Sequence, residues 1–155
     1  MEGVRERLLE EVKRLERELR IELPKEIKAA LSMGDLRENA EYHAALERQA
    51  FVRARIGQLQ TRLTELGSFS VGHVPKDRVG IGSKVKLFDV DQEQEITYEL
   101  VFPELADHPN GLISVASPIG KGLMGKKEGD LVTIRIPSGE KRFEILEFRS
   151  LHEKS

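Results

Sequence analysis

The chain has 155 residues, with 25 Lys and Arg against 27 Asp and Glu, no Cys and no Trp. The lack of Cys excludes a disulfide framework, thiolate metal sites and a Cys nucleophile. A formal net charge of −2 excludes bulk charge as a source of nucleic-acid affinity. No apolar run approaches the roughly 18 residues that span a bilayer, and the charged N-terminal segment is unlike a secretory signal. We therefore expect a soluble, cytoplasmic protein without a membrane partner.

The first half of the chain has the apolar spacing of an antiparallel helical hairpin. One heptad run comprises Leu8, Val12, Leu15 and Leu19, and a second comprises Val52, Ile56, Leu59, Leu63 and Leu66. Facing members have a constant sum of position numbers, which puts the turn between Asp35 and Leu36, beside the helix breaker Gly34. We predict a coiled-coil hairpin over residues 1–67, about 40 Å long. Such a rod holds no pocket, so its chemistry must lie at the tip or along a face.

Two features predict that the outer part of this hairpin is less regular than its base. Pro24 lies inside the first arm, where it should kink the helix or break one hydrogen bond. The apolar seam also weakens toward the tip, because Leu23 would face Arg48.

The second half changes to short alternating stretches rich in Val, Ile, Leu and Thr. Residues 68–82 have the composition of a linker, and residues 83–155 form a second domain. Strands are predicted at 84–89, 95–101, 112–116, 131–136 and 141–148, with a tight turn at 137–139. Ser117 as N-cap and Pro118 at the first helical position predict one short helix. The fold class is therefore α+β, with a helical hairpin followed by a small antiparallel sheet domain.

Asp35 and Glu38 lie three residues apart at the start of the second arm. One interpretation is a capping box, in which Asp35 caps the helix and Glu38 reaches back to it. The other is a pair of ligands for a hard cation such as Mg²⁺. The pair lies at the end of a rod without a complete site around it, so it makes most sense as ligands delivered into another protein's active site.

The second arm has no acidic residue from Arg48 to Thr64, but it holds Arg48, Arg53, Arg55 and Arg62. One interpretation is a solvated flank whose cations pair with the Glu-rich first arm. The alternative is a basic track for a phosphate backbone. We expect no stacking platform for bases here, because such a platform needs aromatic residues interleaved with the cations, which this run is not expected to provide.

Other chemistry finds little support in the sequence. The four His residues show no zinc spacing, and no P-loop, Rossmann or nucleophile-elbow motif is present. Ser117 has no adjacent His or Asp, so we interpret it as a helix cap.

Two long motifs of the chain identify a family. The first covers the tip and continues into the second arm, as Gly34-Asp35-Leu36-Arg37-Glu38-Asn39-Ala40-Glu41-Tyr42-His43-Ala44-Ala45. The second is Ser117-Pro118-Ile119-Gly120-Lys121-Gly122-Leu123-Met124-Gly125-Lys126-Lys127-Glu128-Gly129-Asp130. Both resemble the bacterial transcript-cleavage factors GreA and GreB, and GreA more closely. The resemblance covers nearly the whole chain in the right order.

The resemblance implies a monomeric accessory factor that has no catalysis of its own. Its FKBP-like C-terminal domain would dock on RNA polymerase through the segment with Ser117 and Pro118. Its hairpin would enter the secondary channel, where Asp35 and Glu38 would share a Mg²⁺ ion with the polymerase. The polymerase would then cut the 3′ end of backtracked nascent RNA, and Arg48 and Arg55 would contact that RNA.

Two other functions remain open from the sequence. The first is a paralogue that binds the same channel and inhibits the polymerase without cleavage, although the intact Asp-Leu-Arg-Glu-Asn run argues against it. The second is prolyl isomerase activity of the FKBP-like domain, which the few aromatic residues of the second half disfavour.

Overall fold

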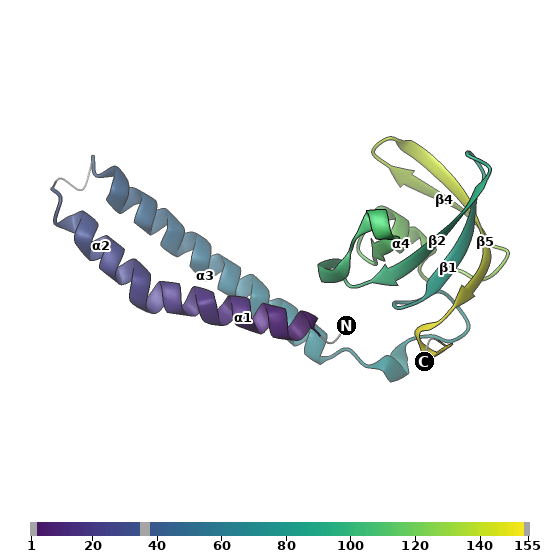
Figure 1. The fold of residues 1–155 in the computed structure, drawn as a ribbon, viewed down its shortest axis with the longest axis horizontal. Helices are drawn as coiled ribbons and strands as arrows, with labels where there is room; N and C mark the ends of the chain where they lie inside the picture. The colour runs from purple at the N-terminus through teal and green to yellow at the C-terminus, as the bar shows by residue number, and fades with distance from the viewer. Residues whose placement is uncertain (1–2, 35–37, 154–155) are drawn as a thin grey trace. The chain divides into compact units, whose positions relative to one another are not determined.

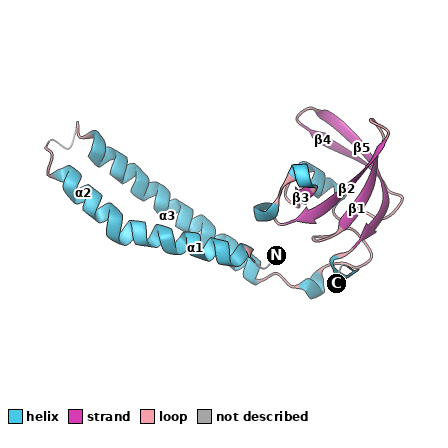
Figure 2. Ribbon diagram, in the orientation of Figure 1, coloured by secondary structure: helices cyan, strands magenta, loops and turns pink. Residues whose placement is uncertain are grey.

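The computed structural model describes residues 3–34 and 38–153. The chain divides into two compact units, residues 2–69 and residues 70–155. The first is all helical and the second is built on one sheet, as the coloured ribbons of Figure 2 show. Each unit is described by itself.

The N-terminal unit is the predicted helical hairpin (Figure 1). Its first arm comprises α1 (Val4–Arg17), a π-helix (Glu18–Glu22) and α2 (Leu23–Leu31), and its second arm is α3 (Ala40–Gly67). The first arm ends at Leu31 and the second begins at Ala40, so their midpoint is the turn position that the heptad arithmetic predicted.

The two arms meet along a single layer of apolar side chains. Buried seam positions include Val12 and Leu15 in α1 and Val52, Ile56 and Leu59 in α3. Leu59 is only 2% exposed and Val52 is fully buried. Burial of such side chains supplies most of the free energy of folding that a two-helix rod can gain.

The π-helix absorbs one extra residue in the first arm. Apolar residues there step by four between Leu15, Leu19, Leu23 and Ile27, whereas a heptad alternates steps of three and four. A π turn holds one residue more than an α turn, so Leu23 returns to the seam and is 1% exposed. Pro24 follows directly, and it has no amide hydrogen to donate. The irregularity predicted at Pro24 is therefore present as a π-helix before it.

The C-terminal unit is a five-stranded sheet in the order β3-β2-β1-β5-β4. The strands are β1 (Lys84–Asp89), β2 (Gln94–Val101), β3 (Leu112–Ser114), β4 (Leu131–Ile136) and β5 (Gly139–Arg149). Strand β1 pairs antiparallel with β2 and β5, and β4 pairs antiparallel with β5. Strand β3 pairs parallel with β2, so the sheet is mixed and the prediction of a wholly antiparallel sheet was wrong in this strand.

The sheet curls around the short helix α4 (Pro118–Leu123) (Figure 2). The core between them includes Leu87, Leu100, Leu123, Phe143 and Ile145, which are all fully buried. Gly120 allows α4 to approach closely, because a Cβ atom at this position would overlap the carbonyl oxygen of Ser114. The sequence thereby fixes the helix against the end of β3.

The segment predicted as a linker packs largely within the C-terminal unit. Val74 and Val79 are buried, and the Nε2 atom of His152 lies 2.8 Å from the carbonyl oxygen of Val74. Within the described residues, no helix has the length and apolar character needed to cross a membrane.

Replacing a seam residue should unfold the hairpin selectively. Leu59→Ala leaves a cavity in the apolar layer between the arms, and we expect a loss of about 2–5 kcal/mol in the free energy of unfolding. Leu9→Ala is the matched control, because Leu9 is 37% exposed and surface changes stay within about 0.5 kcal/mol. Urea unfolding followed by far-ultraviolet circular dichroism measures both. Equal stability of the two variants would contradict the seam.

Candidate functional site at the hairpin tip and second arm

The tip of the hairpin is organised by Asn39. Its side-chain oxygen accepts a hydrogen bond from the amide of Tyr42 at 3.0 Å, so Asn39 is the N-cap of α3. Its Nδ2 atom donates to the carbonyl oxygen of Ala30 at 2.5 Å, at the end of the other arm. One amide side chain therefore both starts the second arm and ties it to the first.

The capping box predicted for Asp35 and Glu38 is wrong for α3, because the helix begins five residues after Asp35. Glu38 precedes the N-cap, is exposed, and makes no hydrogen bond or ion pair with any residue that the structure describes. Asp35 lies outside the described residues. The carboxylate of Glu38 is therefore presented to solvent at the tip with its oxygen atoms available.

The exposed carboxylate of Glu38 fits a role as one ligand of a hard cation, but not as a whole site. Mg²⁺ is commonly held by one or two carboxylates together with water and phosphate oxygens. Over residues 3–34 and 38–153, no group of three or more His, Asp or Glu side chains comes together as a metal site. A metal at this tip would need further ligands from a partner.

Arg48 and Arg55 lie on α3 and are paired with carboxylates of the first arm. The Nε and Nη2 atoms of Arg48 donate to Glu18 at 2.6 and 2.9 Å. The same atoms of Arg55 donate to Glu11 at 2.8 and 3.3 Å. Both pairs are bidentate and both are partly exposed. These two cations therefore pair with the Glu-rich first arm, as one of the two interpretations of the sequence expected. Their contact with RNA stays a prediction.

The ion pairs shift the acidity of the carboxylates that form them. Hydrogen bonds from Arg55 hold the pKa of Glu11 below its ordinary value, and those from Arg48 do the same to the pKa of Glu18. Because both pairs are partly exposed to solvent, they contribute little to stability. The pairs orient the two guanidinium groups, but little free energy is needed to break them.

Phe51 is a residue that sequence reasoning missed. It lies three residues after Arg48 and four before Arg55, on the same face of α3. Phe51 is 55% exposed as a residue, and the guanidinium carbon of Arg48 lies 5.1 Å from the centre of its ring. The helical spacing of Arg48, Phe51 and Arg55 is the signal that could have found it.

A second candidate site lies beside α4 in the C-terminal unit. Ser117 is the N-cap, because its Oγ atom accepts a hydrogen bond from the amide of Gly120 at 3.1 Å. The same hydroxyl donates to the carbonyl oxygen of Ser114 at 2.7 Å. Pro118 occupies the first helical position, as predicted, and is exposed.

These two residues help to line a pocket of about 270 Å³ with mainly apolar walls. The other residues that line it are Ala106, His108, Leu112, Ile113, Ser114, Ile119, Ile136 and Pro137. A concave apolar surface of this kind can receive an apolar side chain of a partner.

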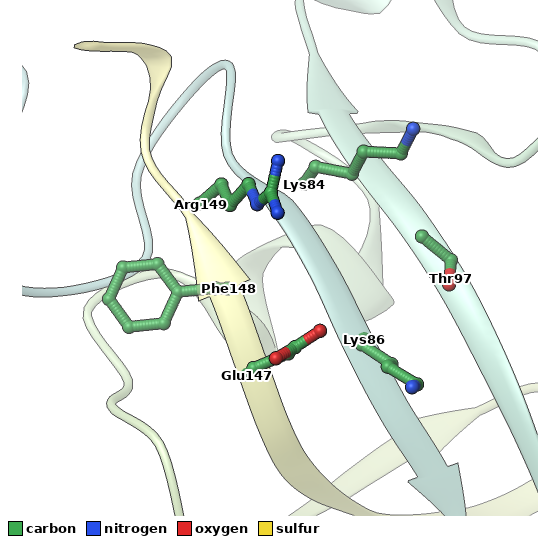
Figure 3. A pocket seen from close by; sticks show the side chains of 6 residues that line it. All are labelled: Lys84, Lys86, Thr97, Glu147, Phe148 and Arg149. Atoms are coloured by element: carbon green, nitrogen blue, oxygen red, sulfur yellow. The ribbon is translucent and has the colours of Figure 1, made fainter. Parts of the chain in front are cut away.

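Another pocket lies on a face of the sheet formed by β2, β1 and β5 (Figure 3). Lys84 has Glu99 and Arg149 as its strand neighbours, and Lys86 has Thr97 and Glu147. Three cations, Lys84, Lys86 and Arg149, line this pocket together with the carboxylate of Glu147, so the face carries both signs of charge. It has the character of a solvated sheet surface.

Comparison with known proteins decides the family. Residues 2–66 match the family model described as transcription elongation factor, N-terminal, and residues 74–150 match transcription elongation factor, GreA/GreB, C-term. The chain belongs to the GreA/GreB family of transcription elongation factors. The recognition of this family from its two long motifs is therefore confirmed.

Curated relatives support the same assignment. The transcription elongation factor GreA of Helicobacter hepaticus is 47% identical over 142 residues, which cover 92% of this chain and 87% of that protein. GreA of Clostridium kluyveri is 46% identical over 147 residues, which cover 90% of this chain and 92% of the relative. A crystal structure of GreA factor homolog 1 from Thermus thermophilus is 26% identical, covers 94% of each chain and has a TM-score of 0.43.

Removing Arg55 should restore the ordinary acidity of Glu11 in this GreA/GreB family member. In Arg55→Gln, we expect the pKa of Glu11 to rise to its usual range while that of Glu18 stays low, because Glu18 pairs with Arg48. Carboxyl NMR titration measures both. A carboxyl group whose pKa is lowered in the folded protein stabilises the fold at any pH above its ordinary pKa. This contribution is lost as the pH falls through the lowered pKa. A Glu11 pKa that does not move in the variant would contradict the ion pair.

Proposed function

We propose that this chain binds RNA polymerase, inserts its hairpin into the secondary channel and stimulates Mg²⁺-dependent endonucleolytic cleavage of the 3′ end of backtracked RNA. It would act as an accessory factor, and the polymerase would perform the chemistry. The observation that carries the proposal is the exposed carboxylate of Glu38, which lies at the tip before the N-cap and has no partner among the described residues.

The shape of the hairpin supports delivery of that carboxylate over a distance. Helix α3 has 28 residues, which at 1.5 Å per residue is roughly 42 Å. Two packed helices are narrow, and their buried apolar side chains, such as Val52 and Leu59, lie in the seam between them. The tip can therefore enter a confined space.

The acidic pair would contribute ligands rather than a complete catalytic centre. A bound Mg²⁺ ion would supply electrostatic activation of water or stabilisation of a leaving oxygen, as in other phosphodiester cleavage. The chain's own part is to hold Glu38 and Asp35 at the end of the rod. Asn39 supports this placement through its bonds to Tyr42 and Ala30.

The apolar pocket beside α4 supports docking by the C-terminal unit. Pro118 lies at its rim and Ser117 holds the start of the helix through two hydrogen bonds. Protein interfaces gain most of their binding free energy from a few apolar anchors seated in such pockets. We propose that the polymerase inserts such an anchor here.

Loss of either tip carboxylate should abolish stimulation without loss of binding. In backtracked complexes with end-labelled RNA, we expect Asp35→Asn and Glu38→Gln to slow Mg²⁺-dependent fragment release by at least about ten-fold. Glu41→Gln is the matched control, because Glu41 is an exposed acid in the first turn of α3. Wild-type rates in both tip variants, or inhibition by the wild-type protein, would overturn the proposal.

A charge in the apolar pocket should weaken polymerase binding. Pro118→Asp places a carboxylate at its rim, where the partner would have to desolvate it, and we expect an affinity loss of about ten-fold or more. Thr133→Asp adds the same charge on an exposed position of β4 outside the pocket. Titration of labelled protein against polymerase compares them. Docking through this pocket would be ruled out if both variants bound like wild type.

A further inference from the structure

Phe51 is exposed in a place where the hairpin does not need an aromatic residue. The seam of α3 uses Ala45, Val52, Ile56 and Leu59, and Phe51 lies beside that seam with more than half of its surface in solvent. Among the described residues of the hairpin, it is the only aromatic residue that counts as a large exposed hydrophobic side chain. An exposed aromatic ring offers a flat apolar face that a nucleobase can cover.

The two cations of this face flank the ring at helical spacing. Arg48, Phe51 and Arg55 occupy positions i, i+3 and i+7, so all three side chains leave α3 on one side. Glu18 holds two nitrogen atoms of Arg48, and its third, Nη1, donates no hydrogen bond to any described residue. The guanidinium is thus oriented near the ring and keeps a donor for another anion.

We propose that Phe51 is a base-stacking residue for single-stranded RNA and that Arg48 binds the adjoining phosphate. The arrangement of a cation, an aromatic ring and a second cation suits a strand that presents bases and phosphates in alternation. It suits an apolar protein surface less well, because such a surface would offer no acceptor to the Nη1 atom of Arg48, which Glu18 leaves available.

The position of Phe51 agrees with a strand that lies along the hairpin. The residue is eleven positions into α3, which is roughly 16 Å from the start of the helix. This inference rests on the proposed function for its source of RNA, the extruded 3′ segment. The stacking itself requires only the hairpin and a single strand, so it can be tested without polymerase.

The chain contains no Trp, so Phe51→Trp introduces a single fluorescent reporter at the proposed platform. We expect a short single-stranded RNA to quench its emission in a saturable way at low salt. An abasic strand of equal length, which has phosphates but no bases, should leave the emission unchanged. Leu131→Trp is the control, because Leu131 is 75% exposed on β4 in the other unit.

Affinity measured by fluorescence anisotropy of labelled RNA gives a second readout. Phe51→Ala should weaken binding of the base-containing strand by roughly five-fold to 100-fold, which corresponds to the loss of one stacked base. Binding of the abasic strand should not change. Phe51→Tyr should bind like wild type, because it keeps the ring.

Three results would overturn the inference. The first is no quenching of Phe51→Trp up to millimolar RNA, and the second is equal quenching by the abasic strand. The third is an emission change caused only by polymerase that carries no nucleic acid, which would make Phe51 a protein contact. Failure of RNA cleavage alone would remove the proposed function and leave the stacking result standing, so the two failures are distinguishable.

Discussion

The apolar seam between the two arms is the contact on which the hairpin depends. A rod of two helices has one buried layer, so residues such as Val52 and Leu59 supply its cohesion and nothing else in it can be buried to the same degree. All polar chemistry is therefore on the outside. The buried side of each helix forms the seam, so functional side chains must lie on the sides that face solvent. The exposed carboxylate of Glu38 and the Arg48–Phe51–Arg55 face both obey this constraint.

The sequence of the second arm alone indicates a basic face, but ion pairs beside the seam partly neutralise it. Arg48 and Arg55 each donate two hydrogen bonds to a carboxylate of the other arm, Glu18 and Glu11 respectively. Such partly exposed pairs are weak, because solvent screens them. A phosphate group matches the guanidinium geometry as well as a carboxylate does, so the pairing is compatible with exchange when RNA is close. The small net charge of the chain, −2, hides this local arrangement.

Much of the fold could be predicted because it follows from spacing. The heptad runs and their constant sum determine two antiparallel helices and the position of the turn, and the alternation of apolar residues gave β1 and β4 with their observed bounds. The π-helix could also have been found, since three successive steps of four between Leu15 and Ile27 leave one residue too many for a heptad. The parallel pairing of β3 could not, because side-chain alternation is the same for either strand direction.

The candidate site was harder to predict than the fold, because several residues near the turn could cap α3. Asp35 and Asn39 are both good N-cap residues, and the choice depends on which side chain can also reach the first arm. Asn39 does so through Ala30, which leaves Glu38 outside the helix. Phe51 was missed because the run was interpreted from its charged residues alone, and Phe51 lies between two of the cations.

The Mg²⁺ dependence of stimulated cleavage tests the central claim most directly. Glu38→Asp keeps the charge but shortens the side chain, so a carboxylate that helps to hold Mg²⁺ in the polymerase would hold it less well. The account predicts that backtracked complexes with this variant need a higher Mg²⁺ concentration for half-maximal cleavage than complexes with the wild-type protein. An identical Mg²⁺ dependence for the two proteins would contradict it.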